Sequence, residues 1–340
     1  MQVKSLLSFL FAFLSCLALQ AQDVHFTQFN MSPLTVNPAQ AGKFEGTARV
    51  GGIYRNQLAS IIRDEYGTPG AYVDAPILPG FRKRDWIGVG VGFFTDRAGT
   101  SQLKRSSFGL GGTYHLALDK KGKTVISIGG QYGNESRGLN RDSLTLEDHL
   151  RDNRDVSLSQ DYGKINQGDV SFKDVNAGIM LSAQLNKNMD IQIGYAMYHI
   201  GRPNYGLSSS LSSKMPRRAV VHGQMNAVLN DRFTLSPTFL FQTMSGADEI
   251  IVQAMGGYLF NPERSIYLDF GLSYRLADAL NLSPIVGMRV KDLKVGFAYD
   301  INTGSLSNTS VRGGFEIAAS YIFKIYKPSV VKPKVLCPRF

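Results

Sequence analysis

Hydrophobic and polar residues alternate along most of this chain, from about residue 47 to residue 324. In segment 293–299 the odd positions are large and apolar, whereas the even positions are small or charged, and segment 315–323 repeats this pattern. Because successive side chains of a β-strand point to opposite faces, each segment has one apolar face and one polar or small face. The pattern predicts an all-β protein built from amphipathic strands.

About fourteen such segments can be placed, an even number, as in single-chain bacterial outer-membrane barrels. Their connections form two alternating sets. One set is mostly short and rich in Asn, Asp, Gly and Pro, as in hairpin turns, and the other is longer and polar. Since outer-membrane barrels have short periplasmic turns and longer external loops, we expect an antiparallel transmembrane barrel over 47–324, with both termini in the periplasm. The expected strands are 47–56, 70–76, 85–95, 102–117, 123–133, 170–186, 189–200, 217–229, 232–243, 249–260, 264–275, 278–290, 292–301 and 310–324.

The first residues resemble an export signal. Lys4 precedes an apolar run over 6–19, and Ala21 offers a small residue for cleavage, so we expect a signal peptide over 1–21. A lipoprotein acylated at Cys16 is the alternative, but the residues before Cys16 fit it poorly. No later stretch reaches the roughly 20 apolar residues of a spanning helix, so any membrane crossing must use strands.

Composition agrees with an exported barrel. The chain is 43% hydrophobic and holds 35 glycines, which suits a barrel whose inner face is polar. Without the leader, Cys337 is the only cysteine, so no intramolecular disulfide can form. The formal net charge is +10, without the basic runs of nucleic-acid modules. This charge favours anionic lipid of the outer leaflet of the outer membrane, or an acidic protein, as partner, and no nucleic acid.

Several segments near the two ends resemble the PorP/SprF family, outer-membrane proteins of the Bacteroidetes type IX secretion and gliding machinery. The N-terminal segments are VHFTQFNMSPL (24–34), NPAQAG (37–42) and YRNQ (54–57). The C-terminal segments are FAYDIN (297–302), GGFE (313–316) and CPRF (337–340). The strands between them are those of a generic barrel.

The resemblance implies a barrel that performs no chemistry and needs no cofactor. Members of the family hold a secreted adhesin or other cargo protein at the cell surface through the cargo's C-terminal domain, or connect the outer membrane to the periplasmic ring lipoprotein of the secretion motor. Both alternatives stay open, and long external loops favour the cargo. The rival hypothesis from another class is a small-solute porin or transporter. An enzyme is not expected, since no nucleophile arrangement or phosphate-binding glycine loop stands out.

Two groups of candidate residues concern the lumen. Segment 22–46 is expected to act as a plug or periplasmic segment, with Phe26, Phe29 and Leu34 inside the barrel; a docking strand is the alternative. Arg55, Arg312 and Glu316 face away from the apolar sides of the first and last strands, which pair when a barrel closes. Since Arg facing lipid costs about 2–4 kcal/mol at the midplane, we expect an ion-pair network in the lumen at this seam. A transport pathway is the alternative.

Two further groups concern partners. The long external loop 134–169 is expected to cover the barrel mouth or to dock another protein, because long loops often carry binding sites. Its candidate residues are Leu144, Leu146, His149 and Leu150. The proline-containing tail 325–340 cannot continue the sheet and is expected in the periplasm, where it is either flexible or bound to a partner or the barrel rim through Cys337, Arg339 and Phe340.

Metal binding is not expected from the sequence. The five histidines are scattered and have no Cys, Asp or Glu companions at ligand spacing. They are His25, His115, His149, His199 and His222.

Overall fold

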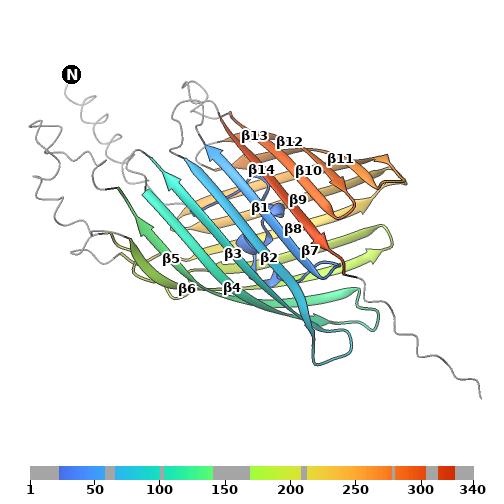
Figure 1. The fold of residues 1–340 in the computed structure, drawn as a ribbon, viewed down its shortest axis with the longest axis horizontal. Helices are drawn as coiled ribbons and strands as arrows, with labels where there is room; N and C mark the ends of the chain where they lie inside the picture. The colour runs from blue at the N-terminus through green and yellow to red at the C-terminus, as the bar shows by residue number, and fades with distance from the viewer. Residues whose placement is uncertain are drawn as a thin grey trace, which may run out of the picture.

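Fourteen antiparallel strands close into one barrel in the computed structural model (Figure 1). The structure describes residues 23–57, 66–99, 103–140, 169–207, 213–277, 280–303 and 313–325. Each strand pairs with its neighbours in sequence, and β1 pairs with β14 to close the barrel, which confirms the expected fold. The strands are β1 (Ala48–Gln57), β2 (Gly67–Pro79), β3 (Trp86–Ala98), β4 (Leu103–Ala117), β5 (Thr124–Gly138), β6 (Val170–Asn186), β7 (Met189–Tyr198), β8 (Arg218–Val228), β9 (Phe233–Met244), β10 (Ala247–Asn261), β11 (Ile266–Leu276), β12 (Asn281–Val290), β13 (Leu293–Asn302) and β14 (Gly314–Phe323).

The apolar face of the strands points outward. On β14 the side chain of Ile317 is 48% exposed, whereas its neighbour Glu316 is 1% exposed. On β13 Phe297 and Tyr299 are likewise exposed, and Asp300 is buried inside. A soluble sandwich would show the reverse, so this distribution fits a barrel surrounded by lipid. Within the described ranges, no helix is long and apolar enough to cross a membrane.

Some strand ends differ from the sequence-based expectation. Strand β5 continues to Gly138 rather than ending at residue 133, because its polar last residues still pair with both neighbours, as in Ser107↔Glu135 and Glu135↔Phe172. The expected loop 134–169 therefore starts within a strand, and the apolar alternation stops before the hydrogen bonding does. Strand β7 ends at Tyr198 rather than at residue 200, where His199 adopts a positive φ of 57°.

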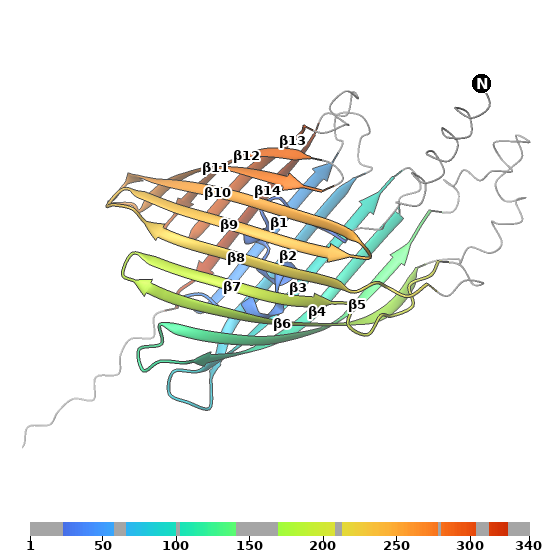
Figure 2. The same ribbon diagram turned by 180° about the vertical axis from the view of Figure 1, so that it is seen from behind.

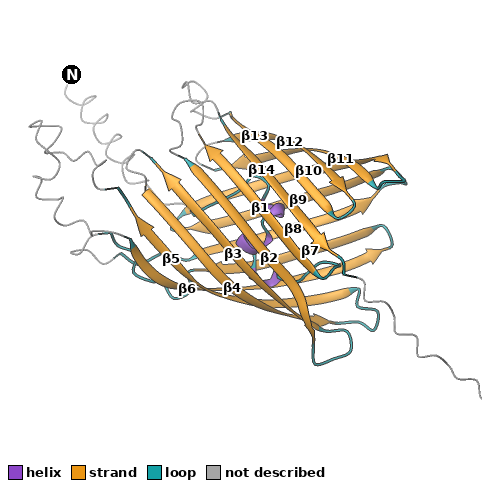
Figure 3. Cartoon of the chain, in the orientation of Figure 1, coloured by secondary structure: helices purple, strands orange, loops and turns teal. Residues whose placement is uncertain are grey.

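A short N-terminal segment lies inside the barrel. It contains the helical turns η2 (Phe29–Met31), α2 (Pro33–Val36) and η3 (Pro38–Gln40), drawn in purple within the ring of strands in Figure 3 and also visible from behind in Figure 2. Its prolines stand at the first positions of α2 and η3, where their fixed φ suits a helix start. We call residues 23–42 the lumenal segment.

The lumenal segment crosses the barrel from one end to the other. Asp23 contacts Arg105 and Arg218, which stand near the starts of β4 and β8, whereas Gly42 contacts Asp74 near the end of β2. Most of the short hairpin turns lie at the Gly42 end, which we call the turn end. The opposite end is the loop end, although it also carries the two-residue turn between β9 and β10.

The path of the lumenal segment places the two ends of the described chain apart. Ile325 donates to Thr47 at the turn end, whereas Asp23 lies at the loop end. The expectation that both termini share the periplasmic side stays a prediction, because residues 1–22 and 326–340 lie outside the described residues. A sequence shows that a segment precedes the first strand, but not that it crosses the lumen before reaching that strand.

Candidate functional site in the barrel lumen

The predicted lumen residues Phe26, Phe29 and Leu34 are all buried, each against a different part of the wall. Phe26 packs with Ile53 and Ala318 beside the seam of β1 and β14. Burying an aromatic or leucine side chain contributes about 1.5–3 kcal/mol, so these three contacts fix the lumenal segment along its length. The other clusters join Phe29 and Val36 to Ala196, Tyr198, Val220, Leu240 and Ile251, and Leu34 and Ala41 to Tyr72.

The predicted seam pair is present and binds the lumenal segment. Arg55 and Glu316 face each other in the β1–β14 register, and Arg55 Nη1 lies 3.7 Å from Glu316 Oε2. The Glu316 carboxylate accepts the backbone N–H groups of Thr27 and Gln28 at 2.8 and 2.6 Å. Arg55 also donates to Asp300 at 2.7 Å. We call Arg55, Asp300 and Glu316 the seam cluster; the third predicted member, Arg312, lies outside the described residues.

A second charged cluster holds the start of the lumenal segment. Asp23 pairs with Arg105, with Arg218 at 3.1 Å and with His199 at 3.4 Å. Arg105 in turn donates two hydrogen bonds of 3.0 Å to Glu135. The set is completed by Asp174, and we call it the Asp23 cluster: Asp23, Arg105, Glu135, Asp174, His199 and Arg218.

The ionisation of the Asp23 cluster follows from its geometry. Burial by itself would lower the pKa of His199, but the hydrogen bonds and charges of Asp174 and Asp23 outweigh burial and raise that pKa to about 9. Burial would raise the pKa of Asp23, yet the charges of Arg105 and Arg218 hold it well below its usual value. Both groups are therefore charged at neutral pH.

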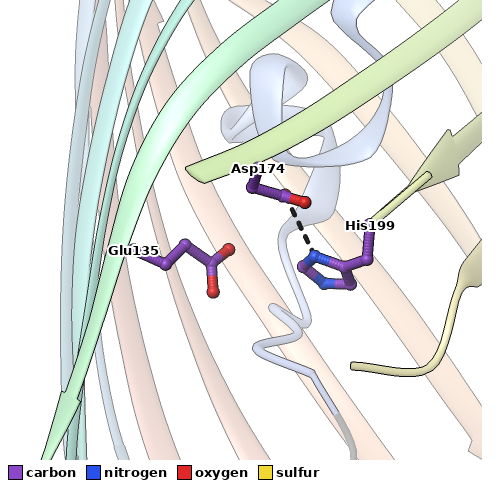
Figure 4. Close-up of side chains that lie close together, drawn as sticks. All are labelled: Glu135, Asp174 and His199. Carbon is purple, nitrogen blue, oxygen red and sulfur yellow. Dashed lines mark ion pairs between the residues drawn. The ribbon is translucent and has the colours of Figure 1, made fainter. Parts of the chain in front are cut away.

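Three members of this cluster could in principle meet one metal ion. Glu135 on β5, Asp174 on β6 and His199 after β7 have ligand atoms within 4.8 Å of one another. Figure 4 shows the three side chains lying close together. Their charges are already matched, since Arg105 occupies both oxygens of Glu135 and His199 Nδ1 lies 3.0 Å from Asp174. The arrangement fits an ion-pair network better than a metal site. The sequence missed this proximity because the three residues are far apart along the chain.

The NPAQ part of the lumenal segment is bound through Asn37, which is fully buried. Its amide donates to the carbonyl oxygens of Ile179 (3.1 Å) and Tyr195 (3.3 Å), and its Oδ1 accepts from Ala39 N at 2.8 Å. A Cβ on Gly178 would lie 2.0 Å from that oxygen, so the wall requires glycine here. The side chain thus caps η3 and joins it to β6 and β7.

The AG end of the same motif is bound at the turn end. His115 Nε2 lies 2.8 Å from the Ala41 carbonyl oxygen, so this nitrogen carries the proton and donates. Gly42 N donates to Asp74 at 2.8 Å, and a Cβ on Gly88 would lie 2.0 Å from the Ala41 oxygen. The lumenal segment is therefore bound at both ends and in the middle.

The sequence did not single out most of the residues that bind the lumenal segment. Apart from Asp23, which belongs to the segment itself, they stand at inward positions of their strands or directly beside a strand end, which is a signal too general to select them. The missed residues are Asp23, Asp74, Arg105, His115, Glu135, Asp174, His199, Arg218 and Asp300. Leu144, Leu146, His149 and Leu150, and the tail residues Cys337, Arg339 and Phe340, lie outside the described residues.

A closed barrel with an apolar outer face defines an outer-membrane β-barrel protein. The sequence model described as "Type IX secretion system membrane protein PorP/SprF" matches residues 18–321. The chain belongs to this family, as its end motifs predicted, and is an outer-membrane barrel of type IX secretion. A search of curated proteins finds no match.

Solved structures with a similar fold are outer-membrane barrels. The CymD monoaromatic hydrocarbon channel is 12% identical, with a TM-score of 0.52 over 87% of this chain and 94% of that one. The toluene transporter TbuX of Ralstonia pickettii is 12% identical, with a TM-score of 0.46 over 86% and 93% of the two chains. KdgM porin is 7% identical, with a TM-score of 0.40 over 81% and 99%. At this identity, the likeness to CymD supports the fold alone.

Proposed function

We propose that this protein is a docking subunit of the type IX secretion machinery that carries out no chemistry. It holds a secreted adhesin or other cargo protein at the cell surface, links the outer membrane to a periplasmic ring lipoprotein, or does both. One observation supports this proposal above the others: buried hydrogen bonds and ion pairs fix residues 23–42 across the lumen. A barrel filled in this way offers a rigid surface rather than a passage.

The absence of chemistry is part of the proposal. The buried charged groups of the lumen pair with one another or with the lumenal segment, as Glu316 does with two backbone N–H groups. Hydrogen bonds and ion pairs of this kind hold the groups in fixed positions. Their role is to position the segment.

The division of the chain follows from this role. Residues 1–21 are a signal peptide, the turn end faces the periplasm, and the loop end faces outside. The cargo contacts the external residues around Leu144, Leu146, His149 and Leu150. The tail 325–340 leaves at the turn end, where Cys337, Arg339 and Phe340 reach a periplasmic partner or the barrel rim.

Planar-bilayer recordings separate docking from transport. We expect the intact protein to show no stable open pore, because the lumenal segment occupies the lumen. A variant lacking residues 23–42 that folds should conduct, which shows that the recording can detect an opened barrel. Porin-like conductance of the intact protein would instead favour a small-solute porin or transporter.

Retention of partners in mild detergent tests docking itself. Replacing residues 141–168 with a short Gly/Ser linker should leave a heat-modifiable barrel and reduce retention of the secreted protein. Removing residues 337–340 should spare the barrel and weaken contact with a periplasmic partner. If both variants retain every partner of the native protein, the docking surfaces lie elsewhere.

A further inference from the structure

The β2–β3 turn at the turn end carries an exposed aromatic ring among cations. Phe81 is 94% exposed, and the residues that follow it are Arg82, Lys83 and Arg84, all exposed. The turn is nevertheless well ordered by Asp85, which is 4% exposed. This carboxylate receives Arg82 Nε at 3.0 Å, along with two donors from β4.

The neighbouring β4–β5 turn extends the same charge. Lys120, Lys121 and Lys123 are exposed, and Arg84 of the first turn donates to the Lys121 carbonyl oxygen at 3.2 Å. The acid of this turn, Asp119, accepts backbone N–H groups, including that of Thr124 at 2.6 Å. Asp119 thus stabilises its own turn and Asp85 pairs with Arg82, whereas the side chains of Lys83, Lys120, Lys121 and Lys123 are exposed at the surface. We call these cations the basic rim: Arg82, Lys83, Arg84, Lys120, Lys121 and Lys123.

The surroundings of Phe81 belong to the lipid-facing surface. Its ring stacks on Tyr114, with centroids 5.7 Å apart. Tyr114 points outward, since its strand neighbours Thr113 and His115 are buried in the lumen. Leu78 and Leu118 flank the two turns and are 54% and 51% exposed. The outer apolar surface therefore continues up to the basic rim.

The opposite side of the turn end differs in charge. Its three turns, between β8 and β13, carry Arg232, Arg264 and Lys291, but also Asp231, Glu263 and Asp292. These charges cancel within each turn. Among the described turns of this end, the excess of positive charge therefore lies on the β2–β5 side, with Lys187 of the next turn, between β6 and β7, extending it.

We propose that the basic rim binds the phosphate groups of anionic phospholipids, with Phe81 inserted at the boundary between headgroups and acyl chains. Clusters of four to eight Lys or Arg beside a membrane attract anionic headgroups, and aromatic rings favour the interface. A continuous apolar surface below the cations favours lipid over an acidic protein, because it places the cations at headgroup depth. With the orientation proposed above, this lipid belongs to the periplasmic leaflet.

Native mass spectrometry of the full-length barrel in detergent tests this proposal. The probes are phosphatidylglycerol and phosphatidylcholine, added separately, and the readout is the number of lipids retained. The test variant is K83Q/K120Q/K121Q, which leaves the Arg82–Asp85 contact intact. The matched control is R232Q/R264Q/K291Q, which removes the same charge from the other side. Heat-modifiability on gels reports folding.

We expect the native protein and the control to prefer phosphatidylglycerol, and the test variant to lose at least about tenfold in apparent affinity for it, since each surface cation strengthens binding several-fold. Replacing Phe81 with Ser should weaken retention of both lipids. Equal losses in the test and control variants, or an unchanged preference in both, would overturn the proposal. Unchanged lipid binding with loss of an acidic periplasmic protein would assign the rim to protein docking instead.

Discussion

The two charged clusters that bind the lumenal segment are built in different ways. The seam cluster comes from β1, β13 and β14, which are neighbours once the barrel closes. The Asp23 cluster combines β4, β5, β6 and β8 with the residue after β7, and takes its central carboxylate from the lumenal segment itself. The first cluster is part of the wall and receives the segment, whereas the pairs of the second are joined into one cluster by Asp23 of the segment.

This difference predicts different consequences of damage. In the seam cluster, Glu316 satisfies two backbone N–H groups and faces Arg55, so its loss affects both barrel closure and the segment. In the Asp23 cluster, Arg105 keeps Glu135 and Arg218 keeps the Thr35 carbonyl oxygen when Asp23 is lost. The seam cluster should therefore matter more for global stability, and the Asp23 cluster more for the position of the segment.

Glu316→Ala should have the largest effect. It leaves Arg55 with one carboxylate and the Thr27 and Gln28 N–H groups without their acceptor. Breaking a buried pair in this way costs about 3–5 kcal/mol of the free energy of unfolding. Urea unfolding in detergent, followed by heat-modifiability, measures the loss. Glu263→Ala, at an exposed turn, is the control and should change the free energy of unfolding little. Equal stability of the two variants would contradict a stabilising role of the seam cluster.

The seam could be predicted from the sequence because closure of a barrel pairs its first and last strands. Arg55 and Glu316 lie at inward positions of those strands. Because the two strands pair over only ten residues, each inward charge has few inward residues that it can face. The Asp23 cluster could not be predicted, because it depends on where the lumenal segment runs relative to five other elements. Strand number and the outward apolar face followed from local alternation. The crossing of the lumen has no local signal.

Asp23→Asn should lower the free energy of unfolding by less, about 1.5–3 kcal/mol, which is the range for hydrogen bonds to charged groups. Its effect on the segment should be larger, because residues 23–25 lose their contacts with Arg105, Arg218 and His199. Limited proteolysis should then cut before Phe26 in the variant and not in the native protein. Protection equal to that of the native protein would mean that the seam cluster alone holds the segment.

High pH should weaken the Asp23 cluster selectively. The pKa of His199 is raised from 6.5 to about 9, so its stabilising contribution is complete below pH 6.5 and is lost as the pH rises through 9. Between pH 7 and 9 the loss is about 2 kcal/mol, from 1.36 kcal/mol per pKa unit. Unfolding of the native protein and of His199→Gln, compared over this range, isolates the effect. The variant should show a flatter pH dependence; parallel curves would contradict the assignment of a protonated His199.

Gly88→Ala should have the smallest effect on unfolding and tests the segment at the end farthest from the Asp23 cluster. The added methyl group would lie 2.0 Å from the Ala41 carbonyl oxygen, so the contact of the AG end with β3 cannot form unchanged. Because the segment can shift while the barrel stays closed, we expect the free energy of unfolding to fall by about 1 kcal/mol, at the low end for overpacking.

Gly112→Ala is the matched control, since a Cβ there meets nothing within 4 Å. Hydrogen exchange should show faster exchange of the Gly42 N–H, which donates to Asp74, in the Gly88 variant alone. If that exchange is unchanged while the free energy of unfolding is lowered, the methyl group disturbs the wall rather than the segment. The two charged clusters are then enough to keep residues 23–42 in place.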